Sequence, residues 1–103
     1  MHPSIAEKRK EIADLCLRYH VRRLEVFGSA ARGVDFDPER SDVDFLYELE
    51  RQPGADYADA YFGLLEGLEV LFRRHIDLIE PTAVENPFMQ AGIDRSREVV
   101  YQA

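Results

Sequence analysis

An apolar, strand-like run that leads directly into a glycine-rich turn most constrains the fold of this chain. The run Val21–Phe27 has the apolar and β-branched composition of a strand, and it ends at Gly28. The segment Gly28–Gly33, with the sequence GSAARG, combines two glycines with a serine. Because glycine has no Cβ, backbone N–H groups and a hydroxyl in such a turn can approach an anion closely. The strand and turn together therefore predict a cradle for a phosphate group.

A second strand-like run begins with a pair of aspartates. Asp42 and Asp44 open the run Asp42–Leu49. Since residues two apart on a strand point to the same face, both carboxylates are expected on one side of the sheet. Alone, an Asp-x-Asp is more often an exposed polar strand edge, and a Gly-Ser pair is mostly a turn. Together, a carboxylate pair beside a phosphate cradle indicates a nucleoside triphosphate bound with divalent metal ions.

Two other aspartates precede this pair in an acidic loop and could be confused with it. Asp35 and Asp37 lie between the turn and the second strand. Only Asp42 and Asp44 belong to an apolar run that fixes their direction, which favours them as metal ligands. The lone Cys16 has no ligand spacing with His20 or His75, which argues against a zinc site.

Length and charge limit the class of protein further. A chain of 103 residues predicts one domain over 1–103, with a single modest core. The formal net charge of −7 argues against binding a nucleic-acid backbone, which needs basic patches. One cysteine excludes a disulfide within the chain, and no apolar run approaches a membrane span or a signal-peptide core. A cytoplasmic location is the expectation.

Helix signals fill the remaining sequence. Ser4 followed by Glu7 reads as a capping box that opens a helix through about Tyr19. Gly63 and Gly67 on a long helix suggest close packing of that helix against the sheet. The other expected elements are a short helix over Ser29–Arg32, the long helix over about Asp56–Arg74, a third strand over Ile76–Ile79, a last helix opened by Asn86 and Pro87, and a final strand over Glu98–Tyr101.

In this combination the motifs resemble those of the polymerase-beta-like nucleotidyltransferases. The short chain is similar to the minimal nucleotidyltransferases (MNT), many of which are antitoxins of HEPN–MNT toxin–antitoxin pairs. The resemblance covers nearly the whole chain and implies an α+β fold, a small mixed β-sheet with helices packed on one face. The matching residues are Gly28, Ser29, Arg32 and Gly33 in the family's G-S-x-A-R-G motif, Asp42 and Asp44 in its D-x-D motif, and Asp77 as the third aspartate on a later strand.

The resemblance also implies a role for each residue. Asp42, Asp44 and Asp77 would bind two Mg²⁺ ions, with Mn²⁺ as an alternative, and Asp77 could also accept a proton from the attacking hydroxyl. Gly28 and Ser29 would hold the β- and γ-phosphates of ATP. Arg32 and Gly33, the other two motif residues of the turn, would also bind the nucleotide. Arg32 either neutralises a phosphate or pairs with an acidic residue to brace the loop.

The motifs occupy nearly the entire chain, so the acceptor is expected to arrive as a separate partner. The resemblance implies a HEPN-domain ribonuclease toxin, with a tyrosine hydroxyl as acceptor and AMP from ATP as the transferred group. Two alternatives remain open. The chain could neutralise the toxin by binding and masking it, or it could be one subunit of a two-chain nucleotidyltransferase that modifies a small molecule.

Overall fold

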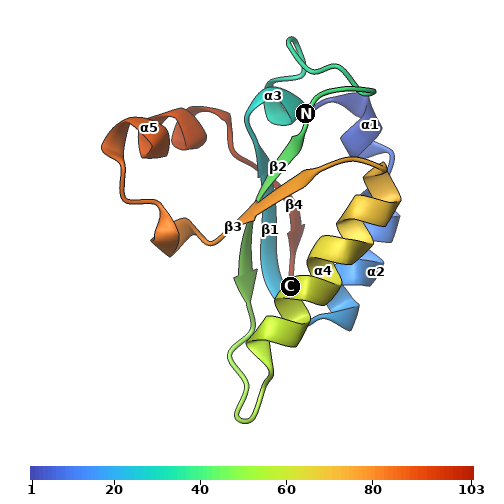
Figure 1. Cartoon of the computed structure of the whole chain (residues 1–103), viewed down its shortest axis with the longest axis vertical. Helices are drawn as coiled ribbons and strands as arrows, with labels where there is room; N and C mark the ends of the chain where they lie inside the picture. Colours follow the sequence, from blue (N-terminus) through green and yellow to red (C-terminus); the bar gives the residue numbers. More distant parts are fainter.

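A computed structural model describes residues 1–103, which form one mixed β-sheet and the helices around it (Figure 1). None of the helices combines the length and the apolar composition that a membrane-spanning helix needs. The strands Val21–Phe27 and Ile76–Ile79 have the predicted bounds. The elements are, in chain order, α1 Pro3–Ala6, α2 Arg9–Arg18, β1 Val21–Phe27, α3 Ser29–Arg32, β2 Val43–Leu49, α4 Tyr57–Phe72, β3 Ile76–Ile79, the 3₁₀ turn η1 Pro81–Ala83, α5 Pro87–Ser96 and β4 Glu98–Gln102.

The sheet has the strand order β3-β2-β1-β4 and combines both kinds of pairing. β1 pairs antiparallel with β2 and with β4, whereas β2 and β3 are parallel. A parallel pair needs a crossover connection, and α4 supplies it. The register places Asp44 of β2 between Phe27 of β1 and Asp77 of β3. The predicted α+β fold with a small mixed sheet is confirmed, and its topology brings the strand ends that carry the motifs to one place.

The two faces of this sheet are covered unequally. One face and the helices α1, α2 and α4 enclose the main core, which includes the buried residues Ile5, Ile12, Leu24, Val26, Val43, Phe45, Leu64, Leu68 and Leu78. On the other face a small cluster of Phe27, Leu46 and Ile93 lies beneath α5. Figure 1 shows α2 and α4 on one side of the sheet and α5 on the other. The expectation of helices on one face holds for α1, α2 and α4, and α5 departs from it because Phe27 and Leu46 form an apolar patch that Ile93 covers.

The N-terminal helix differs from the prediction. Instead of one helix over Ser4–Tyr19, the chain forms α1 and α2 with a short turn between them. The capping box is absent, because Nδ1 of His2 accepts the Ser4 N–H at 3.1 Å and Glu7 ends α1 instead of capping it. The N–H of His2 donates to the carbonyl of Ala30 at 2.8 Å. Through this bond the start of the chain is held against α3.

The two glycines of α4 pack against α2, not against the sheet. A methyl group on Gly67 would lie 2.5 Å from Cδ2 of Leu15, and one on Gly63 would overlap the ring of Tyr19. The absence of side chains at these positions lets the two helices approach closely. Close packing was predicted correctly, but the partner element was not.

Candidate active site

The turn after β1 depends on the glycine at position 28. Gly28 has φ 70° and ψ −150°, a conformation that is open to glycine and strained for other residues. A Cβ at this position would lie 2.7 Å from Oδ2 of Asp44. The sequence therefore places a glycine where the backbone must pass a carboxylate of the neighbouring strand.

Helix α3 follows this turn and presents its first residue to the same region. Ser29 is the first helical residue and Gly28 is the N-cap, so the serine is not the capping residue. The N–H of Gly33 donates to the Ser29 carbonyl at 2.8 Å, and Gly33 ends the helix with φ 78°. Ala30 and Ala31 are buried and anchor the helix. The GSAARG segment thus forms one fixed turn of helix in which its two glycines mark the start and the end.

A residue that the sequence did not indicate holds the turn from the other side. The N–H of Gly28 donates to Oγ of Ser96 at 3.0 Å. Ser96 is the last residue of α5, 68 positions away in the chain. Only the folded structure reveals this pairing, because nothing in the local sequence links a serine at a helix end to a distant turn.

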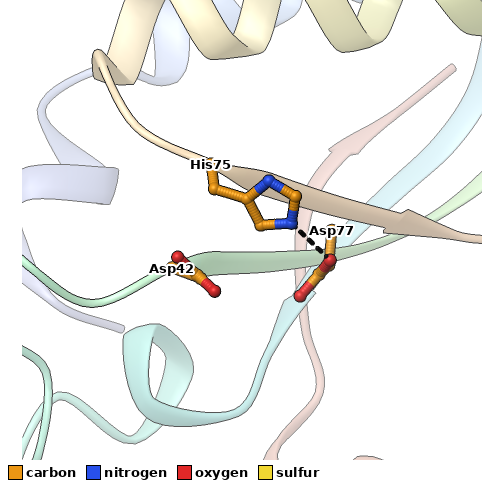
Figure 2. Close-up of side chains that lie close together, drawn as sticks. All are labelled: Asp42, His75 and Asp77. Carbon is orange, nitrogen blue, oxygen red and sulfur yellow. Dashed lines mark hydrogen bonds and ion pairs between the residues drawn. The ribbon is translucent and has the colours of Figure 1, made fainter.

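The structure brings the three predicted aspartates together at the ends of β2 and β3. Asp44 and Asp77 are cross-strand neighbours in the parallel register, and both are half-buried. Asp42 is exposed and lies one residue before β2. Asp42, Asp77 and His75 each have a possible ligand atom within 4.8 Å of the others (Figure 2). His75 was not predicted as part of this group, although its position two residues before Asp77 on a strand was a signal that could have found it.

This convergence shifts the proton affinity of the Asp44 carboxylate. Burial raises the pKa of Asp44 to about 7, and the hydrogen bond and negative charge of Asp77, together with the charge of Asp42, act in the same direction. The hydrogen bond to Asp77, 2.9 Å from Nε2 of His75 to Oδ1, raises the pKa of His75. Asp44 and Asp77 therefore form a site of concentrated negative charge that a cation would stabilise.

Arg32 takes up one of its two predicted roles in this structure. Its Nη2 lies 2.7 Å from Oδ2 of Asp35, and both side chains are about half exposed. The hydrogen bond from Arg32 lowers the pKa of Asp35. The pair braces the loop that follows α3, and it engages Asp35 in an ion pair with Arg32.

The loop between α3 and β2 is held by Arg74, which lies between the end of α4 and the start of β3. Nη1 of Arg74 donates to the carbonyl of Ser41 at 3.0 Å and to that of Asp37 at 3.3 Å. The guanidinium lies 5.5 Å from the ring centre of Phe36, which is buried. These contacts fix the backbone directly before Asp42 and so help to position the Asp42 carboxylate.

Comparison with known proteins agrees with this geometry. The family model described as "Nucleotidyltransferase domain" matches residues 6–100. The chain belongs to the nucleotidyltransferase family. Two relatives of this nucleotidyltransferase come from Methanocaldococcus jannaschii and are named "Putative protein adenylyltransferase", MJ1379 and MJ0128. They are 32% and 34% identical to it over 90 residues, which cover 87% of this chain and 85% of each relative.

Solved structures are similar to the chain over most of its length. A structure described as a "putative minimal nucleotidyltransferase" is 27% identical, has a TM-score of 0.71 and is matched over 95% of both chains. A toxin–antitoxin structure with AMP-PNP has a TM-score of 0.65 at 16% identity, over 92% of this chain and 73% of that one. The second likeness concerns the fold. The resemblance to minimal nucleotidyltransferases is thus confirmed over nearly the whole chain.

Proposed function

We propose that this nucleotidyltransferase transfers AMP from ATP to a hydroxyl group of a partner protein and that it acts as an antitoxin on a HEPN-domain toxin. The observation that carries the transfer proposal is the position of Asp44, which lies beside Asp77 and against the Gly28 turn. A phosphate-sized turn and adjoining carboxylates are what the binding of a metal–nucleotide complex requires.

The donor set fits divalent metal ions of the kind that the family uses. Carboxylate oxygens are the ligands that Mg²⁺ prefers. Burial raises the pKa of Asp44 to about 7, and the negative charges of Asp77 and Asp42 add to this effect, which a bound cation would offset. Asp42, Asp44 and Asp77 would hold two Mg²⁺ ions, or Mn²⁺ in their place. When bound, such ions neutralise the charge that develops on the attacking and leaving oxygens.

The chain's own residues bind and orient the substrates. The N–H groups of the turn and the Ser29 hydroxyl would hold the β- and γ-phosphates. Gly33 ends α3, and Arg32 would exchange Asp35 for a phosphate. The acceptor oxygen then forms a bond to the α-phosphorus, the bond to the β-phosphate bridging oxygen breaks, and pyrophosphate leaves. Asp77 would accept the proton of the attacking hydroxyl.

Both named relatives support a protein as the acceptor. They are described as protein adenylyltransferases, and the fold neighbours include toxin–antitoxin structures. We propose a tyrosine of the toxin as the modified residue, because its phenolic hydroxyl lies at the end of a long side chain that can extend from the surface of another protein.

The variant Asp77→Asn tests transfer against simple masking. It should still bind ATP through Asp42 and Asp44 and should still bind the toxin, but the toxin's mass should no longer rise in AMP units. Loss of a general base or a metal-positioning group typically costs 10²–10⁴-fold in rate, which intact-protein mass spectrometry resolves easily. Glu85→Gln, an exposed acid in the segment before α5, is the matched control and should modify the toxin like the parent chain.

The cellular readout decides between the two mechanisms. If Asp77→Asn protects cells from the co-expressed toxin as well as the parent chain does, masking is the mechanism and the transfer proposal is wrong. If protection and modification are lost together while the two proteins still co-purify, transfer is the mechanism.

A further inference from the structure

His75 offers the one nitrogen atom among the possible ligand atoms of the group formed with Asp42 and Asp77. It begins the extended segment that leads into β3, two residues before Asp77, and both side chains point to the same side (Figure 2). Its Nε2 lies 2.9 Å from Oδ1 of Asp77, and the side chain is 62% exposed. Asp42 completes the group, with all possible ligand atoms within 4.8 Å of one another.

These distances suit ligands of a single ion. With bonds of about 2.1 Å, two ligand atoms at right angles around a metal lie about 3 Å apart, and two opposite ones about 4.2 Å apart. The distance of 2.9 Å between Nε2 of His75 and Oδ1 of Asp77 matches that of two ligand atoms at right angles. Because His75 and Asp42 are exposed, small side-chain rotations can adjust the longer distances while the strands stay in place.

The mixed donor set has a consequence for the choice of metal. Mg²⁺ takes oxygen ligands and keeps several of its waters, whereas imidazole nitrogen suits transition-metal ions. We propose that His75 is a ligand of the ion held by Asp42 and Asp77, and that through His75 this site binds Mn²⁺ and Co²⁺ in preference to Mg²⁺. The inference rests on the proposed function, because it concerns an ion at the same carboxylates.

The competing role for His75 is a surface hydrogen bond to Asp77. An exposed pair of this kind contributes little to stability. Glutamine at position 75 can donate a similar hydrogen bond, but it offers no imidazole nitrogen. His75→Gln therefore removes the proposed ligand while it retains the alternative contact.

The experiment titrates the metal-free chain with Mn²⁺, Co²⁺ and Mg²⁺, each alone, and follows binding by calorimetry. Pulsed EPR of the Mn²⁺ complex reports whether a nitrogen is bound directly. His75→Gln should weaken Mn²⁺ and Co²⁺ binding at least tenfold, change Mg²⁺ binding less than about twofold and abolish the nitrogen signal. The control His20→Asn removes an exposed imidazole just before β1, at the end far from Gly28, and keeps a residue type that tolerates the φ of 56° there.

The outcomes separate this inference from the proposed function. Unchanged Mn²⁺ affinity in His75→Gln, an equal loss for Mg²⁺ and Mn²⁺, or no Mn²⁺ binding to the parent chain would each overturn the role of His75. If Asp42→Asn still weakens Mg²⁺ binding in that case, the carboxylate site of the proposed function stands. If Asp42→Asn leaves the affinity for all three ions unchanged, the metal site of the proposed function fails as well.

Discussion

Asp44 is a carboxylate whose ionised form is disfavoured both by burial and by the negative charge of its neighbours. It is half-buried, it faces Asp77 across the parallel pair, and a glycine is required at position 28 to leave room for it. In the metal-free chain these neighbours favour its protonated form near neutral pH. A carboxylate held at this cost to stability is expected where a cation is to be bound.

The double variant Asp42→Asn and Asp44→Asn tests the metal assignment. Both changes keep the side-chain shape and remove the charge, so the strengthening of ATP binding by Mg²⁺ or Mn²⁺ should largely vanish. Calorimetric titration with ATP, with and without the metal, measures the effect. An unchanged Mg·ATP affinity in the double variant would show that these aspartates are not the ligands.

Ser29→Ala tests the phosphate turn separately from the metal. A hydroxyl bond to a charged phosphate contributes roughly 1.5–3 kcal/mol, so the affinity for ATP should fall about tenfold or more. The melting temperature should remain nearly the same, because Gly28 and not Ser29 is the N-cap of α3. A large drop in melting temperature would instead assign Ser29 a structural role.

At the scale of elements, the end of α5 is joined to β1 by a buried ion pair. Glu25 is only 3% exposed, and its carboxylate accepts two hydrogen bonds from Arg97, at 2.7 and 2.9 Å. Nε of Arg23 lies 2.9 Å from the same carboxylate. Ser96, the neighbour of Arg97 in the chain, accepts the Gly28 N–H. Glu25 and Arg97 therefore also help to hold the Gly28 turn in place.

Glu25→Gln should destabilise the protein in a pH-dependent way. The hydrogen bonds from Arg97 lower the pKa of Glu25, so its stabilising effect is present above the ordinary carboxyl pKa and is lost as the pH falls through the lowered value. We expect a loss of about 2 kcal/mol at pH 7, less than for a fully buried pair because both arginines reach solvent. Urea unfolding at a series of pH values should show this difference shrinking below about pH 4, and a constant difference would contradict the assignment.

The contact between α2 and α4 allows a matched pair of glycine substitutions. A methyl group at Gly63 would overlap the Tyr19 ring, so Gly63→Ala should cost about 1–2 kcal/mol despite the better helix propensity of alanine. Gly92 of α5 has only Nη2 of Arg95 near a new Cβ, at 3.9 Å, so Gly92→Ala should gain roughly 0.5–1 kcal/mol. Thermal unfolding compares the two variants, and equal effects would show that helix packing does not require Gly63.

For the whole molecule, local patterns predicted the elements better than their contacts. Val21–Phe27 and Ile76–Ile79 are apolar runs bounded by polar or turn-forming residues, so their limits were predictable from the sequence alone. The helix break near Glu7 was not, because it depends on the capping by His2 and on the bond to α3. The role of Ser96 was equally hidden, since a tertiary hydrogen bond leaves no local pattern.

The order of the strands also bears on how the site is completed during folding. β1 and β2 form an antiparallel pair over a short sequence separation, whereas β3 joins only after the α4 crossover has closed a longer loop. The glycine turn and the first two aspartates can therefore assemble early, and Asp77 arrives with a four-residue strand at the sheet edge. Amide hydrogen exchange should be faster in β3 than in β1, and each opening of that edge would switch off transfer while the rest of the domain stays folded.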